Sequence, residues 1–150
     1  MSATRAGSAP EAEVHGPVTS RSPAWRTPAA IGVAVGAAAL VVALHDPHQQ
    51  GSYGFCPMLA LTGWWCPACG GLRATHDLLH GDVAGAWGMN ALWVVLAPVL
   101  VVLWVVWLVR ALRGRPGPAL RPWAWWGLLV LVVAFGVLRN VPALAPWLAP

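Results

Sequence analysis

Hydrophobic positions gather into three long runs that contain no charged residue, at 27–44, 91–109 and 122–138. A hydrocarbon core needs about 20 consecutive apolar residues, or about 17 at the short end, so each run predicts a membrane-spanning helix. The uncharged stretch around the second run begins earlier, at Val83, which predicts an extension of that helix beyond the membrane. We therefore expect an all-α membrane protein with three transmembrane helices.

Residues 1–26 differ from these runs because they are rich in Ala, Ser, Pro and Gly and show no apolar periodicity. This composition predicts a disordered N-terminal tail before a membrane domain at 27–150. The first run also fits a secretory signal peptide. A retained helix is favoured, since the polar leader is long and no small-x-small cleavage site follows.

A fourth uncharged stretch, Tyr53 to Leu72, is long enough to span a membrane but is interrupted by prolines and glycines. A straight helix would not choose Pro57, Gly63, Pro67, Gly70 and Gly71. We therefore expect residues 55–65 to form a re-entrant or interfacial segment that returns to the face from which it entered.

A short amphipathic helix is predicted after this segment. Arg73, His76, Asp77 and His80 are spaced i, i+3, i+4 and i+7, which places them on one helical face. Gly81 is suited to end this helix and Asp82 to cap the next one. The simplest interpretation is a solvated face with an Arg73–Asp77 ion pair worth about 0.2–0.5 kcal/mol. His15, His45 and His48 are interpreted as isolated tail or loop residues.

Composition and charge support a membrane location. Only 9% of the residues are charged, against about 25% in soluble domains. All nine basic residues are arginines, which excludes a Walker-type phosphate-binding lysine and a Schiff-base lysine. Seven of the nine precede the first run or lie at 110–121, so the positive-inside rule predicts a multi-pass cell-membrane protein with a cytoplasmic N-terminus and an outer-face stretch at 56–90. The expected partner is the lipid bilayer, with other membrane proteins or self-association left open; nucleic acid is not expected.

All three cysteines lie in that outer stretch, at Cys56, Cys66 and Cys69. A Cys-x-x-Cys pair before a helix is typical of thiol–disulfide chemistry, because the helix N-terminus and the nearby Arg73 lower thiol pKa values. Cys66 and Cys69 are therefore redox candidates. A structural disulfide is the simpler alternative in an oxidising outer compartment.

The same cysteines are also metal-ligand candidates. Cys66, Cys69, His76 and His80 provide the donor types of a Cys2His2 site for zinc or another transition metal. The histidine spacing suits two ligands on one helix turn. Cys56 could replace one of the histidines.

The motif residues of this stretch resemble a family of small bacterial membrane proteins known as domain of unknown function 2752. The residues that carry the resemblance are Cys56-Pro57, Thr62-Gly63, Cys66-Pro67-Ala68-Cys69-Gly70, Arg73, Gly81-Asp82 and Asn90. The resemblance implies that the cysteines, Arg73 and Asp82 form a shared core, and it implies no activity. Ala91 departs from the proline usual in the family, which predicts a more regular join to the second span.

Three functions remain open at this point. The favoured one is a structural or interaction module without catalysis, because no complete catalytic set is present. The alternatives are a metal-binding membrane protein and a membrane thiol–disulfide oxidoreductase.

Overall fold

The computed structural model describes residues 23–49, 53 and 56–150. The helices are α1 (Arg26–Leu44), α2 (Pro57–Thr62), α3 (Gly71–Leu79), α4 (Val83–Leu112), α5 (Pro122–Leu138) and α6 (Ala145–Leu148). No strand occurs among these residues, so the predicted all-α class is confirmed for them. Most of the expected disordered tail lies outside the described residues.

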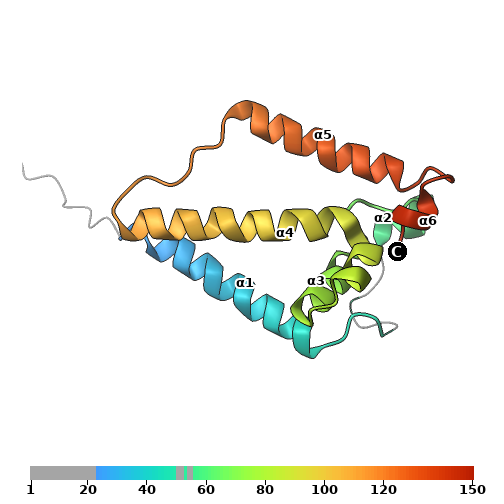
Figure 1. Cartoon of the computed structure of the whole chain (residues 1–150), viewed down its shortest axis with the longest axis horizontal. Helices are drawn as coiled ribbons and strands as arrows, with labels where there is room; N and C mark the ends of the chain where they lie inside the picture. Colours follow the sequence, from blue (N-terminus) through green and yellow to red (C-terminus); the bar gives the residue numbers. More distant parts are fainter. Residues whose placement is uncertain (1–22, 50–52, 54–55) are drawn as a thin grey trace, which may run out of the picture.

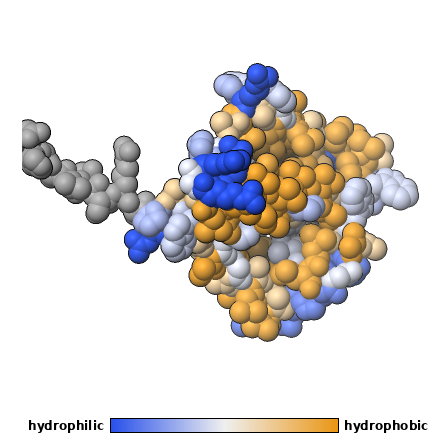
Figure 2. Space-filling model, turned by 60° about the vertical axis from the view of Figure 1, so that its left-hand side comes forward, coloured by the Kyte–Doolittle hydropathy of each residue, from blue (hydrophilic) through white to orange (hydrophobic). Residues whose placement is uncertain are grey.

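Two helices, α1 with 19 residues and α4 with 30, are long and apolar enough to cross a membrane, judged by length and composition. The third apolar run forms α5, which has 17 residues and is shorter. Many valines and leucines on these helices are exposed, and hydrophobic side chains cover much of the face drawn in Figure 2. Large exposed apolar surfaces mark contact with a membrane or a partner.

The short helices gather at one end of the molecule (Figure 1). There α3 lies against both α1 and α4, and α6 lies against α4. The loop from α4 to α5 and the start of α1 lie at the opposite end (Figure 1). Arg26 at the start of α1 and the arginine-bearing loop after α4 are therefore separated from the cysteine-rich stretch by the length of the long helices.

The helix α4 is broken at Asn90, whose backbone angles are φ −160° and ψ 92°. The more regular join predicted from Ala91 is therefore wrong. The break does not depend on proline, because the Asn90 side chain stabilises it by accepting the Trp93 backbone N–H at 3.0 Å. An asparagine in extended conformation that bonds to the third following N–H is an N-cap.

The cap predicted at Asp82 is confirmed, since its carboxylate accepts the Gly85 N–H at 2.8 Å. Between the two caps, α4 packs on α3 through small residues, and Ala74 and Ala86 are completely buried. The Trp93 indole N–H donates to the Thr75 hydroxyl at 2.7 Å. This contact fixes α3 against the start of the long apolar part of α4.

We predict that Gly32→Ala weakens the packing of α1 on α4, whereas Gly36→Ala does not. A Cβ at Gly32 would overlap the Trp104 ring, while nothing lies within 4 Å of a Cβ at Gly36. Overpacking of this kind costs about 1–3 kcal/mol. The measurement is the unfolding free energy in detergent micelles, followed by circular dichroism. Equal effects of the two substitutions would contradict this packing.

Candidate functional site

The three cysteine thiols converge on one point. Cys56 directly precedes α2, and Cys66 and Cys69 lie in the turn between α2 and α3. The sulfur atoms are 3.5 Å apart for Cys56 and Cys66 and 2.7 Å apart for Cys66 and Cys69, and all three lie within 4.8 Å of one another. None is joined in a disulfide.

The turn that carries two of these thiols depends on Gly70. Its φ of +81° favours glycine, and a Cβ at this position would collide with the Met89 carbonyl. The turn is closed by the Cys69 N–H, which donates to the Cys66 carbonyl at 3.1 Å. Glycine therefore allows the turn to approach the end of the first segment of α4.

Asn90 fastens the turn from the α4 side. Its side-chain amide donates to the Pro67 carbonyl at 2.9 Å and to the Cys69 carbonyl at 3.0 Å. Only 2% of the residue is exposed. The side chain that caps the second segment of α4 thus also holds the backbone of the cysteine turn.

Two residues after α5 fasten the turn from the other side, and sequence reasoning treated them only as the end of the third run. The Arg139 guanidinium donates through Nη1 to the carbonyls of Cys66 at 2.9 Å and Cys69 at 3.1 Å. The Asn140 amide bonds to both backbone groups of Trp65, accepting the N–H at 2.8 Å and donating to the carbonyl at 2.9 Å. The cysteine turn is therefore held between α4 and the end of α5.

The charge of Arg139 lacks a carboxylate partner among the described residues. The side chain is completely buried, and its Nε and Nη2 atoms have no hydrogen-bond partner in the described part of the chain. The guanidinium lies 5.0 Å from the centre of the Phe135 ring. Burial lowers the pKa of Arg139, whereas negative charge on Cys69 and Cys66 raises it. The effect of burial is the larger of the two.

The thiols differ in acidity. Hydrogen bonds, above all from the Leu59 backbone and the Cys69 side chain, lower the pKa of Cys56 to about 7. Burial and the side-chain contacts with Cys66 and Cys56 raise the pKa of Cys69 to about 12. Cys56 therefore loses its proton more readily than Cys69 near neutral pH.

The histidines predicted as alternative metal ligands lie outside the cysteine cluster. His76 donates from Nδ1 to the Val42 carbonyl at 2.9 Å, and His80 donates from Nδ1 to the His76 carbonyl at 2.8 Å. Within the described residues, the group of potential metal-binding atoms that share one place consists of Cys56, Cys66 and Cys69.

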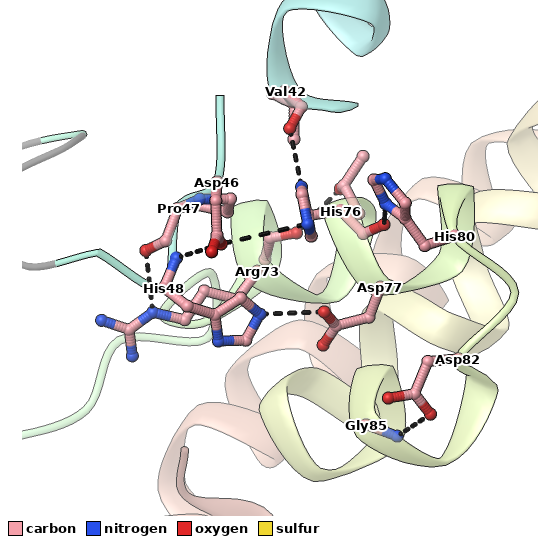
Figure 3. Close-up of polar contacts among 12 residues, drawn as sticks. Val42, Asp46, Pro47, His48, Arg73, His76, Asp77, His80, Asp82 and Gly85 are labelled. Carbon is pink, nitrogen blue, oxygen red and sulfur yellow. Dashed lines mark hydrogen bonds and ion pairs between the residues drawn. The ribbon is translucent and has the colours of Figure 1, made fainter. Parts of the chain in front are cut away.

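The predicted Arg73–Asp77 ion pair does not occur. Asp77 is 8% exposed and pairs with His48 Nε2 at 2.8 Å, while Arg73 Nε donates to the Pro47 carbonyl at 3.3 Å (Figure 3). The loop after α1 covers this face of α3, so the face is not simply solvated. The interpretation of His48 as an isolated loop residue is wrong for the same reason.

One sequence signal could have drawn attention to Arg139. In the orientation that the positive-inside rule predicts, the third run ends on the outer face, where arginine is disfavoured. An arginine that breaks this rule next to an apolar run needs a buried partner. Asn140 gave no comparable signal, because an asparagine after a helix is ordinary.

We predict that Cys56 in the reduced, metal-free protein reacts with a maleimide in a pH-dependent manner with a midpoint near 7. Its pKa lies below the ordinary 9.0, so the reactive thiolate accumulates as the pH rises through 7. In Cys66→Ala and Cys69→Ala variants the midpoint moves upward, because each loses a hydrogen bond that favours the thiolate. Mass spectrometry of the labelled protein measures the rates. An unchanged midpoint in both variants would exclude this coupling.

Comparison with known proteins identifies one match. Residues 56–104 match the model of a family described as "Protein of unknown function (DUF2752)". No curated protein matches the chain, and no solved structure does. The matched segment includes the three cysteines and Asn90 and ends before Arg139. Over these residues the chain is similar to a family whose description assigns no activity.

Proposed function

We propose that this chain is a multi-pass membrane protein that holds zinc or a similar soft transition-metal ion in its three-cysteine cluster. The convergence of three sulfur atoms within 4.8 Å carries this proposal. Thiolates are the preferred ligands of such ions. The bound ion would join α2 to the turn before α3, which gives the cluster a structural role without requiring catalysis.

The distances between the sulfur atoms suit such an ion. A tetrahedral zinc ion with bonds of about 2.3 Å holds its sulfur ligands about 3.8 Å apart. The Cys56–Cys66 distance of 3.5 Å is already close to this value. Cys66 and Cys69, at 2.7 Å, need to separate by about 1 Å to bind the same ion.

The buried arginine supports a charged cluster over a neutral disulfide. Three thiolates and a divalent ion carry one net negative charge, which balances the positive charge of Arg139. An uncompensated charge in a buried site costs several kcal/mol. A Cys66–Cys69 disulfide would remove the two thiols whose negative charge raises the pKa of Arg139.

The membrane arrangement we propose has three spans, α1, α4 and α5, with the N-terminus in the cytoplasm and the cysteine cluster on the outer face. The separation of the arginine-bearing loop from the cysteine turn by the length of the helices supports it (Figure 1). The positive-inside rule then sets the direction.

Thiol–disulfide exchange is the second candidate, and the pKa of Cys56, lowered to about 7, favours it. The Cys56 thiolate would attack a substrate disulfide, form a mixed disulfide and release one substrate thiolate. The Cys66 thiolate would then attack the Cys56 sulfur and release the second. The substrate is thereby reduced and Cys56 and Cys66 are oxidised to a disulfide.

We predict that the full-length protein, purified in detergent under reducing conditions, contains one equivalent of zinc per chain. Losing a residue that only hydrogen-bonds to a metal ligand lowers the metal affinity roughly 10- to 100-fold. Replacing any one of the three cysteines with serine removes a ligand itself, so the zinc affinity falls by more than this. His76→Ala and His80→Ala serve as controls and retain the metal. Elemental analysis with chelator competition measures both quantities. Metal-free protein whose thiols are all reduced would exclude the proposal.

We predict that Arg139→Gln weakens zinc binding by about 10- to 100-fold, because the anionic cluster loses its counter-ion. Arg139→Lys keeps the positive charge and retains more of the affinity than Arg139→Gln, which separates charge from hydrogen bonding. Arg121→Gln, at the opposite end of the molecule, is the surface control. Chelator competition on variants of matched circular dichroism provides the measurement. Equal affinities of wild type and Arg139→Gln would refute the charge argument.

A further inference from the structure

A cavity of about 450 Å³ adjoins the cysteine cluster, and all three cysteines line it. Its walls are otherwise mainly apolar, with Tyr53, Leu59 and Leu72 among them. Cavities of this size are typical of small-molecule sites. The metal centre proposed above would therefore be reached from this cavity.

The cluster provides three protein ligands, and among the described residues no histidine, carboxylate or further cysteine joins it. Zinc sites with three protein ligands keep a fourth position open for an external molecule. A soft ion surrounded by thiolates favours another sulfur donor at that position. The cavity is the space from which such a donor would arrive.

One wall of the same cavity carries a cation, Arg73. Its expected partner Asp77 is bound to His48, and Arg73 itself bonds to the Pro47 carbonyl through Nε. Within the described part of the chain, its two Nη groups have no acceptor at hydrogen-bond distance. A guanidinium whose Nη groups lack an acceptor among the described residues is suited to bind a carboxylate through two parallel hydrogen bonds.

We propose that the cavity binds a small molecule carrying both a thiol and a carboxylate. The thiolate completes the coordination of the metal, and the carboxylate pairs with Arg73. The apolar walls accommodate the carbon chain between the two groups. This inference rests on the proposed metal centre and specifies what its open position receives.

The test uses the full-length protein in detergent with Co²⁺ as a spectroscopic substitute for zinc, and 3-mercaptopropionate as the probe. The probe is expected to strengthen the sulfur-to-cobalt charge-transfer absorption and to saturate. Mercaptoethanol, which lacks the carboxylate, binds about 10- to 100-fold more weakly. Propionate, which lacks the thiol, leaves that absorption unchanged.

Variants assign the two contacts. Arg73→Gln removes the advantage of 3-mercaptopropionate over mercaptoethanol, whereas Arg121→Gln preserves it. Both variants are expected to bind one equivalent of Co²⁺, measured by elemental analysis after desalting.

Three other outcomes would each contradict a different part of the proposal. Stoichiometric Co²⁺ with no spectral response to 3-mercaptopropionate overturns this inference and leaves the metal centre intact. Equal affinities for the two thiols, unchanged in Arg73→Gln, overturn the role of Arg73. Absence of Co²⁺ binding by the reduced protein overturns the metal centre itself, and the inference with it.

Discussion

The backbone carbonyls of the turn from Cys66 to Cys69 need hydrogen-bond donors, and the rest of the structure is arranged to supply them. A buried carbonyl without a partner costs about 1–3 kcal/mol. Asn90 supplies donors from the break in α4, and Arg139 supplies them from the end of α5. The break in α4 and the end of α5 are thereby fixed relative to one short turn, and the thiols are fixed with it.

Of the two residues that donate to the turn, Asn90 is neutral and Arg139 is positively charged. This difference decides whether a counter-ion is needed. A neutral side-chain amide donates hydrogen bonds to carbonyls without requiring a counter-ion. A buried guanidinium also requires an anion, and Cys66 and Cys69 are the nearby groups of the described chain whose negative charge raises its pKa. The protonation state of the thiols and the stability of the end of α5 are therefore linked.

Local signals made much of the fold predictable. The ends of α5 follow from Pro122 and from the polar pair that begins at Arg139, and the start of α4 follows from the cap at Asp82. Capping and apolar run length are properties of neighbouring residues, so they can be read without knowledge of the fold. The spacing of Cys66 and Cys69 suggested that these two thiols lie together, whereas Cys56 was an alternative to one of the histidines.

The residues that complete the site could not be predicted in the same way. Asn90 lies at a break in α4, and the carbonyls to which its side chain donates belong to a different segment, the turn before α3. The contact of His48 with Asp77 links positions 29 residues apart, across the loop after α1. Such contacts are set by tertiary packing, which no local pattern encodes. For the same reason Arg73 bonds to the Pro47 carbonyl and not to Asp77.

The bond from Arg139 to the Cys66 carbonyl has a consequence for the order in which the molecule is assembled. The two residues are separated by 73 positions, so the turn receives its second clamp only after α5 has been synthesised. Before that moment the turn has its own Cys69 N–H bond and the Asn90 amide to hold it, and the buried charge of Arg139 is absent. A growing chain therefore passes through a stage in which the cysteine turn is able to bond to Asn90 and not yet to Arg139.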